Sequence, residues 1–370
     1  MGHFLFIEAF YGGSHKYFAD GLIKHSSHKI DLMALPDRFW KWRMRGAALY
    51  FAEKIKNPEI YDGIIVTNML SLSDLKALWY NISTPFILYF HENQILYPLA
   101  EGEKEDLHYG FTDITNSLTA DVIYFNSHYH KSAFINSLKP FLSRFPDKNP
   151  YWVIDKIEEK SNVLYPGCYL NEKASKRLSK QNPPHIVWNH RWEHDKNPYD
   201  FFSALINLDR EGIDFKLIVL GEQYKKSPKI FNEIKTRLKE KIVHFGFVDN
   251  YCEYQYWLEK ADIVLSTAFQ ENFGISIVEA IGSGCFPLLP DRLSYRELIP
   301  EKYHSLCIYK NQNDLLFKLI KLITNYDINS VKELVEHNHR FSWQNIIKDY
   351  DRELNLLIKK SLPKKGGIFI

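Results

Sequence analysis

The chain has 370 residues, of which 45% are apolar, and its formal net charge at pH 7 is +2. This length exceeds one typical hydrophobic core and predicts two domains. A nearly neutral protein is not a general polyanion binder, so any nucleic-acid surface must be local. The four cysteines form no C-x-x-C pair, which indicates neither a zinc knuckle nor a disulfide framework. With no signal segment and no apolar run of about 18 residues, we expect a soluble cytoplasmic protein that does not bind membranes.

In chain order, short apolar runs alternate with amphipathic stretches. The first half predicts strands at FLFIEAF (4–10), KIDLMAL (29–35), YDGIIVTN (61–68), PFILYFHE (85–92), DVIYFNS (121–127) and NVLYPG (162–167). Helix-like stretches such as 71–80 and 103–120 lie between them. The second half repeats this rhythm with HIVWNH (185–190), FKLIVLGE (215–222), KIVHFGFV (241–248), DIVLSTA (262–268) and CFPLLP (285–290). The alternation predicts an α/β fold with parallel sheets covered by helices on both faces.

A polar, lysine-rich stretch at 171–184 interrupts this rhythm and predicts a linker. We therefore expect Rossmann-like, doubly wound domains at 1–170 and 185–340. A C-terminal helix and tail at 341–370 could pack back on the first domain, and the last residues, 359–370, predict a loose tail. Two such domains would face a central cleft, with the carboxyl ends of both sets of strands directed towards it. The sequence gives no indication of the oligomeric state.

The stretch ENFGISIVEA (271–280) follows a predicted strand and opens a helix. Free amides in the first turn, together with the helix dipole, favour an anion there. Glu271 and Glu279 could lie up to about 12 Å apart along a helix. This separation is too large for paired acid–base work on one bond but suits hydroxyl groups on either side of a diphosphate. The alternative is that Glu279 merely belongs to a solvated helix face.

The stretch HIVWNHRWEHDKNP (185–198) adds positive charge after another strand. Arg191 and Lys196 are well placed to neutralise a diphosphate leaving group. The same stretch contains a rival pattern, H-x-x-E-H at 190–194, which also occurs in zinc proteases. That chemistry needs the histidines on a helix face, whereas these follow a strand and run into Asp-Lys-Asn-Pro. The diphosphate interpretation is therefore favoured.

These motifs resemble the donor site of family-4 retaining glycosyltransferases of the GT-B fold. Further stretches, EAFYGGSHK, FWKWRMRGAALYF, LYFHENQILYP, FNSHYH and the terminal FSW, make residues 3–345 similar to the tRNA-queuosine mannosyltransferases. The resemblance implies GDP-mannose as donor and queuosine in the anticodon of tRNA(Asp) as acceptor. It implies retention of configuration and no metal or other cofactor, because basic side chains and helix amides replace the ion.

The resemblance also assigns donor-site roles. Arg191 and Lys196 would hold the diphosphate, Glu271 the donor sugar and Glu279 the nucleotide ribose. The remaining donor-site residues implied are Gly246, Phe247, Val248, Asn272, Phe273, Gly274 and Ile275. One departure concerns the usual Lys-Gly pair, which is Lys196-Asn197 here and leaves the shape of this loop open.

The first half contributes two candidate elements. Gly12 and Gly13 follow the first strand, where the absence of side chains would let the backbone approach the donor diphosphate; a tight turn without a ligand is the alternative. His91 follows a buried strand, and a lone histidine there is more often a satisfied core residue. The resemblance implies an active-site role for it, without deciding whether it transfers a proton. The residues expected on the acceptor side are His15, Lys16, Glu92, Asn93, Asn126 and His128.

The stretch DRFWKWRMRGAALYF (37–51) predicts a local nucleic-acid surface. Cations that follow phosphates beside aromatics that stack on unpaired bases are typical of proteins that grip RNA loops. The tRNA-binding residues expected are Arg38, Trp40, Lys41, Trp42, Arg43 and Arg45. The alternative is a helix with its tryptophans in the core and its cations in solvent.

Three functions remain open at this stage. The favoured one is a retaining, metal-independent glycosyltransferase that moves mannose from GDP-mannose to queuosine in tRNA. The same donor chemistry on a glycan or lipid-linked sugar, or galactosyl transfer to queuosine, is the second. An RNA-binding module with an inactive transferase fold is the third, and the intact acidic and basic donor-site residues disfavour it.

Overall fold

The computed structural model describes residues 1–99, 102, 104–170, 181–223, 228–325 and 327–361. These residues form two compact units. The described residues of the first unit lie within Met1–Leu99, Glu103–Gly167 and Trp343–Ile370, and the second is built on Cys168–Ser342. The division at Gly167 and Cys168 lies close to the linker predicted at 171–184, of which 171–180 lie outside the described residues.

The first unit contains a six-stranded parallel sheet in the order β2-β1-β3-β4-β5-β6. Its strands are β1 (His3–Tyr11), β2 (Lys29–Pro36), β3 (Gly63–Thr67), β4 (Phe86–Phe90), β5 (Val122–Phe125) and β6 (Ser161–Val163). Apolar runs buried on both faces explain the parallel pairing. The order reverses beside β1, and ligands of such sheets bind beyond the carboxyl ends of the strands at this point.

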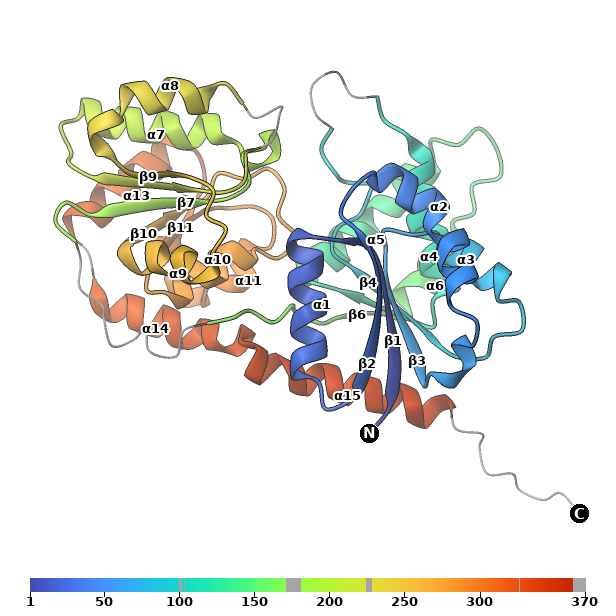
Figure 1. Cartoon of the computed structure of the whole chain (residues 1–370). Helices are drawn as coiled ribbons and strands as arrows, with labels where there is room; N and C mark the ends of the chain where they lie inside the picture. Colours follow the sequence, from blue (N-terminus) through green and yellow to red (C-terminus); the bar gives the residue numbers. More distant parts are fainter. Residues whose placement is uncertain (100–101, 103, 171–180, 224–227, 326, 362–370) are drawn as a thin grey trace, which may run out of the picture. The chain divides into compact units, whose positions relative to one another are not determined.

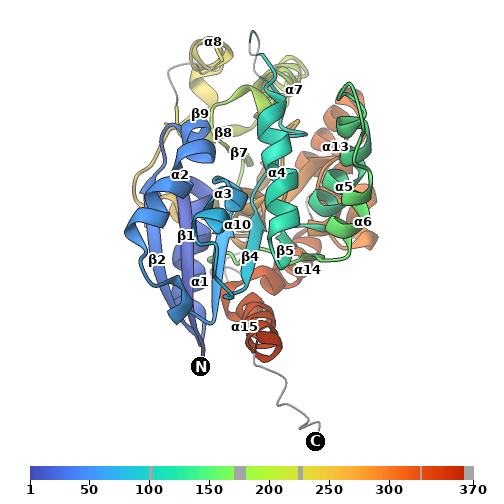
Figure 2. The same cartoon turned by 90° about the vertical axis from the view of Figure 1, so that its right-hand side faces the viewer.

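Helices cover both faces of this sheet (Figures 1 and 2). One face carries α1 (Gly13–His25) and α15 (Trp343–Ser361). The other carries α2 (Trp40–Lys54), α3 (Leu72–Leu78), α4 (Leu107–Thr119), α5 (His128–Leu142) and α6 (Trp152–Glu158). The main apolar core lies between the sheet and this second layer, with Met44, Phe51, Leu75, Ile114 and Phe134 among its fully enclosed side chains.

The C-terminal helix α15 packs on the first unit. Its buried residues, Trp343, Ile346, Ile347, Tyr350, Leu354 and Leu357, recur at helical spacing. The Trp343 indole fits against two glycines, because a Cβ atom at Gly21 or Gly167 would lie about 2 Å from it. Lys359 belongs to the helix, and the part of the predicted tail at 362–370 lies outside the described residues.

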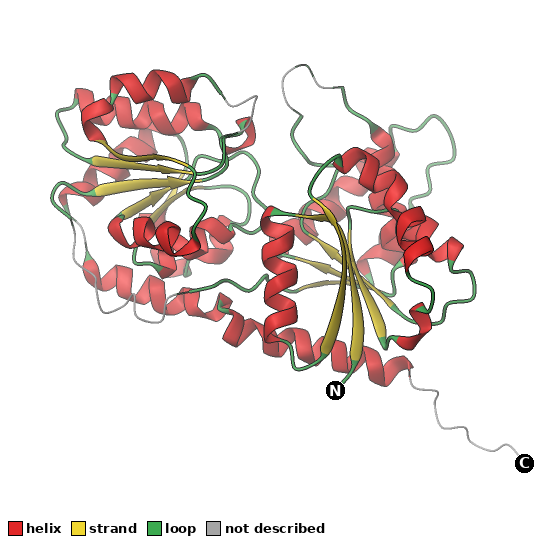
Figure 3. Cartoon of the chain, in the orientation of Figure 1, coloured by secondary structure: helices red, strands yellow, loops and turns green. Residues whose placement is uncertain are grey.

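The second unit repeats the architecture, with a sheet that lies between helices (Figure 3). Its strand order is β12-β11-β10-β7-β8-β9. Its strands are β7 (His185–Asn189), β8 (Lys216–Leu220), β9 (Ile242–Gly246), β10 (Ile263–Leu265), β11 (Phe286–Pro290) and β12 (Ile308–Tyr309). Its helices are α7 (Pro198–Arg210), α8 (Ile230–Arg237), α9 (Tyr251–Lys260), α10 (Ile275–Gly282), α11 (Tyr295–Leu298), α12 (His304–Cys307), α13 (Gln312–Thr324) and α14 (Ile328–Asn338). The order reverses beside β7, so the loops after β7 and β10 are where a ligand is expected.

The α/β fold class predicted from the sequence is confirmed: both units are doubly wound parallel sheets. All eleven predicted strands are present, and the short β12 is an addition. Within the described residues, no helix combines the length and apolar character that a membrane crossing requires.

Candidate functional site

In the second unit, Lys196 in the loop after β7 contacts the loop after β10. This lysine is only 8% exposed, and its Nζ atom donates a hydrogen bond of 2.7 Å to the carbonyl oxygen of Gln270. The same atom lies 3.4 Å from Oε2 of Glu271 and 3.3 Å from Oδ2 of Asp195. The structure therefore brings together two of the residues predicted for the donor site, Lys196 and Glu271, at the switch point of the sheet.

The charge state of Lys196 follows from these neighbours. Burial disfavours its ammonium, but the charges of Glu271 and Asp195 outweigh burial and raise its pKa above the usual value. Lys196 is thus a fixed cation, and Glu271 is the more exposed of its two acidic partners. A fixed cation beside a partly open carboxylate suits an anionic group next to a hydroxyl-bearing one.

The next residue, Asn197, explains how the Lys-Asn pair replaces Lys-Gly. Its backbone has φ 50° and ψ 59°, the left-handed region that favours glycine and tolerates asparagine. Its side-chain oxygen accepts a hydrogen bond from the Asp200 amide and caps α7. The loop shape that the sequence left open is therefore one that glycine would also adopt.

Glu279 lies within α10 and is buried. The hydroxyl of Tyr254 donates to its Oε2 atom at 3.1 Å, and the hydroxyl of Tyr251 lies 3.4 Å from its Oε1 atom. Burial and then the charge of Glu279 raise the pKa of both tyrosines, so both remain hydroxyl donors. Asn189 completes the network by donating to the Tyr254 hydroxyl at 3.1 Å. Glu279 is thus a fixed carboxylate and not part of a solvated face.

The start of α10 has the geometry expected for anion binding. Gly274 precedes the helix with φ 103°, a conformation that a side chain would strain. Ile275 and Ser276 follow as the first helical residues, where amides have no partner within the helix. Asn272 and Phe273 are buried: Asn272 accepts a hydrogen bond from Gln270, and Phe273 packs edge-on against Phe341.

Arg191 differs from Lys196 in its surroundings. Its side chain is 49% exposed, and its Nη2 atom lies 3.2 Å from Oε2 of Glu193. The neighbouring His190 is buried, and burial and then the charges of Lys196 and Arg191 hold its pKa well below the usual range. Among the described residues, the histidines and Glu193 of the H-x-x-E-H pattern do not come together as metal ligands.

The predicted base-binding backbone, 246–248, follows β9. Gly246 has φ 143°, and no atom lies within 4 Å of the position that a Cβ atom would occupy. Phe247 is 56% exposed, and Val248 is half-buried. The segment therefore presents an open backbone position beside an exposed aromatic ring.

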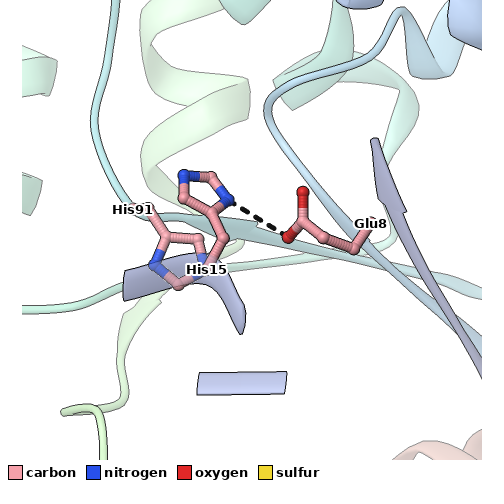
Figure 4. Close-up of side chains that lie close together, drawn as sticks. All are labelled: Glu8, His15 and His91. Carbon is pink, nitrogen blue, oxygen red and sulfur yellow. Dashed lines mark hydrogen bonds and ion pairs between the residues drawn. The ribbon is translucent and has the colours of Figure 1, made fainter. Parts of the chain in front are cut away.

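In the first unit, polar side chains gather at the carboxyl ends of β1 and β4 (Figure 4). Nδ1 of His15 lies 3.1 Å from Oε2 of Glu8, and its Nε2 lies 3.7 Å from Oε2 of Glu92. The rings of His15 and His91 have centroids 4.0 Å apart. Glu8 is fully buried and also accepts hydrogen bonds from Thr67 and the Phe10 amide.

These two histidines carry different charges. Burial alone would lower the pKa of His15, but Glu8 and then Glu92 raise it to about 10. Burial, followed by the charges of His15 and His130, holds the pKa of His91 well below the usual range. Ligand atoms of Glu8, His15 and His91 lie within 4.8 Å of one another, which is close enough for a metal ion. Metal ligation would require His15 to lose the proton that Glu8 and Glu92 favour.

The other predicted acceptor-side residues have structural partners. Asn126 is buried and donates to the backbone oxygen of His91 at 2.9 Å, while its own oxygen lies 2.8 Å from Nδ1 of His130. Asn93 is buried and accepts from the Leu96 amide at 3.0 Å. His128 is exposed at the start of α5. Asn126 therefore positions His91, and His130, which sequence reasoning did not find, positions Asn126.

The opening glycines have two different roles. A Cβ atom at Gly12 would lie 2.0 Å from Oδ2 of Asp37, so the packing of Asp37 within the first unit accounts for that glycine. Gly13 has φ 51° with open space at its Cβ position, which leaves room for a ligand. Lys16 is exposed and pairs with Asp20 and with the Tyr11 hydroxyl.

The predicted RNA surface divides along α2. Phe39, just before the helix, is 72% exposed and Trp42 is 64% exposed. Arg38, Lys41 and Arg45 are also exposed. Trp40, in contrast, packs on the apolar core, and the centroid of its ring lies 5.2 Å from that of Tyr109. Arg43 is half-buried. Trp40 therefore has a packing role, and the most exposed aromatics of this stretch are Phe39 and Trp42.

Comparisons with known proteins cover both units. Residues 3–168 match the family described as tRNA-queuosine alpha-mannosyltransferase N-terminal, and residues 171–342 match glycosyl transferases group 1. The tRNA-queuosine alpha-mannosyltransferase of Drosophila melanogaster is 35% identical over 362 residues, spanning 90% of this chain and 94% of that protein. The chain belongs to the tRNA-queuosine alpha-mannosyltransferase family. The predicted family is thus confirmed, and the protein is a glycosyltransferase.

Solved structures of other glycosyltransferases show that this member of the tRNA-queuosine alpha-mannosyltransferase family has the GT-B fold. Sucrose-phosphate synthase from Thermosynechococcus elongatus aligns with a TM-score of 0.72 at 12% identity, covering 97% of this chain and all of that one. The Anabaena HepE protein in complex with UDP and glucose aligns with a TM-score of 0.68 at 15% identity, covering 96% of this chain and 100% of that one.

Sequence reasoning for this tRNA-queuosine alpha-mannosyltransferase family member missed the residues that hold the predicted ones in place. Glu8 fixes His15, and Tyr251 and Tyr254 fix Glu279. Glu8 could have been found, because a carboxylate within an otherwise apolar strand needs a buried partner. The tyrosines lie on a helix that contains four aromatic residues, Tyr251, Tyr254, Tyr256 and Trp257, and nothing in that pattern marks two of them.

Proposed function

We propose that this protein transfers mannose from GDP-mannose to queuosine in the anticodon of tRNA(Asp), with retention of configuration and without a metal ion. The observation that carries this proposal is the 35% identity to a tRNA-queuosine alpha-mannosyltransferase, which extends through both units. The arrangement of Lys196, Glu271 and Glu279 in the second unit supports the donor half of it.

The donor nucleotide is held first through its ribose. Glu279 is fixed by two tyrosine hydroxyls and has carboxylate oxygens able to accept further hydrogen bonds from ribose hydroxyls. The diphosphate then lies at the start of α10, near the amides of Ile275 and Ser276. Phe247 offers an exposed ring beside the open backbone of Gly246 for the base.

Fixed charge stabilises the leaving group. The bond between the anomeric carbon and the phosphate oxygen breaks, and a bond from the acceptor oxygen forms on the same face of the sugar. The departing phosphate oxygen takes the acceptor's proton. Lys196, held as an ammonium, and Arg191 neutralise the negative charge that develops on the diphosphate, and Glu271 orients the mannose hydroxyls.

The first unit supplies the acceptor side. His91 is neutral, so its imidazole can form hydrogen bonds to a hydroxyl without adding charge, and Asn126 fixes its backbone. His15 is a buried cation held between two carboxylates. The tRNA itself binds through Arg38, just before α2, and through Lys41 and Arg45 on α2; these cations contact phosphates.

The test is a sugar-transfer assay on queuosine-containing tRNA, with GDP-mannose and UDP-galactose compared and EDTA present throughout. Transfer from GDP-mannose alone would support donor, acceptor and metal independence together. Transfer from UDP-galactose would show that UDP-galactose, and not GDP-mannose, is the donor. Binding of tRNA with no release of GDP would indicate an RNA-binding protein without transferase activity. If a nucleotide binds and tRNA receives no sugar, the acceptor is another molecule.

A further inference from the structure

The indole of Trp42 lies close against Gly46 of α2. A Cβ atom built on Gly46 would lie 2.7 Å from Cζ2 and 2.8 Å from Cε2 of Trp42, so only glycine at this position allows the contact. The two residues are one helical turn apart and face the same side. Trp42 is nevertheless 64% exposed. A large ring is therefore supported from one side by the helix and open to solvent.

A second exposed ring lies one turn earlier. Phe39 has φ 57° and ψ 46°, a left-handed conformation that is unusual for a bulky residue. Its carbonyl oxygen accepts the hydrogen bonds from the Trp42 and Arg43 amides that start α2. The fold needs this backbone conformation, which glycine or asparagine would adopt more easily. A phenylalanine kept at 72% exposure in such a position indicates a role for the ring itself.

The charge around the two rings is positive. From Arg38 to Ala52 the sequence has four cations and no acidic residue. Within the described parts of the chain, Arg38 and Lys41 form no ion pair, whereas Arg45 lies over the Tyr109 ring and near Asp106. Unneutralised cations beside open aromatic rings match a strand of phosphates with unpaired bases.

Another exposed tryptophan provides a contrast. Trp152 on α6 is 63% exposed, almost the same as Trp42. Its helix carries Asp155 and Glu158, and Glu159 follows directly. Exposure alone is thus shared by both tryptophans, but the glycine support and the positive surroundings occur only at Trp42.

We propose that Trp42, supported by Gly46, and Phe39 form a stacking platform for unpaired bases of the RNA acceptor. This inference rests on the proposed function in one respect, namely that the acceptor is RNA. It adds that the rings of Phe39 and Trp42 stack on unpaired bases of the loop and so distinguish it from a duplex, while Arg38 and Lys41 bind the adjacent phosphates.

The experiment measures binding of the full chain to two RNAs, a stem-loop with the anticodon loop of tRNA(Asp) and a blunt duplex of the same stem. Trp42→Ala should weaken stem-loop binding about 5- to 150-fold, the range for losing one base–aromatic stack. It should leave duplex binding unchanged, because a duplex offers no unpaired base. Trp152→Ala is the matched control and should change neither. Equal weakening for both RNAs, or no weakening, would overturn the platform.

Gly46→Ala tests the support without removing the ring. Alanine is the better helix former, so thermal stability should be maintained or rise while stem-loop affinity falls. In a Trp42→Ala background the same change should have no further effect on affinity, since its effect acts through the indole. Unchanged affinity in Gly46→Ala alone would show that the indole does not need this glycine for binding.

Sugar transfer separates the two proposals. A wild-type protein that mannosylates tRNA while Trp42→Ala binds the stem-loop normally would retain the proposed function and discard the platform. A wild-type protein that binds the stem-loop through Trp42 but transfers no sugar would retain the platform and discard the proposed function.

Discussion

Nδ1 of His15 lies 3.1 Å from Oε2 of the fully buried Glu8, and this pair fixes a positive charge inside the first unit. The raised pKa of His15, about 10, is the thermodynamic counterpart of that contact. Since the ring of His15 lies 4.0 Å from that of His91, the charged histidine helps to hold its neighbour neutral. At neutral pH, His15 is therefore protonated and His91 is not.

This pair predicts how stability depends on pH. A histidine whose pKa is higher in the folded than in the unfolded chain stabilises fully below pH 6.5, and its contribution is lost as pH rises towards about 10. The unfolding free energy should therefore fall over that window, with a slope of up to about 1.4 kcal/mol per pH unit from this group. Urea unfolding of wild type and His15→Gln across this range measures it. An equal slope in both proteins would contradict the assignment.

The substitution Glu8→Gln probes the same charge from its partner. Burial would still lower the pKa of His15, and only Glu92 would remain to oppose it. Transfer by the variant should therefore show the titration of His15 at a lower pH than in the wild type. An unchanged pH profile of kcat would show that the charge on His15 does not affect the reaction.

Glu271 is the carboxylate that we propose for the donor site, and its loss should have the most selective effect. Glu271→Gln keeps the size of the side chain but removes the charge that lies 3.4 Å from Nζ of Lys196. We expect transfer to fall about 100-fold or more, by analogy with groups that act at the reacting centre, and tRNA binding to stay within twofold. Asp195 still neutralises Lys196, so the fold should be retained. Activity close to wild type would contradict the donor-site assignment.

The support of Glu279 predicts a selective effect on the donor. Tyr254→Phe removes the hydroxyl that donates to Glu279 and accepts from Asn189, at a cost of about 1–3 kcal/mol in stability. The KM for the nucleotide sugar should rise while the KM for tRNA stays constant. Tyr256→Phe, on the same helix with an exposed side chain, is the control. A rise in both KM values would point to general loss of structure.

Much of the fold and of the site could be predicted from the sequence. Buried parallel strands leave apolar runs with recognisable ends, which is why Lys196 and Glu271 could be placed after β7 and β10. The two-residue β12 is too short for any such signal. Side-chain direction was harder: aromatic and basic residues alternate from Phe39 to Arg45, and only the structure turns Trp40 inwards and Trp42 outwards. The packing of Gly12 could not be predicted from the sequence either, because its partner Asp37 is distant in sequence.

The backbone of Asn197 allows the last prediction. Its φ of 50° is accessible to glycine at no cost, whereas alanine there would be strained and would also lose the cap of α7. We expect Asn197→Gly to change the unfolding free energy by less than about 1 kcal/mol, and Asn197→Ala to destabilise by about 1–3 kcal/mol. Because Lys196 directly precedes this residue, Asn197→Ala should also lower transfer, and Asn197→Gly should retain it. Denaturant unfolding and the transfer assay on both variants measure this. If alanine and glycine behave alike, the left-handed conformation is not what places Lys196.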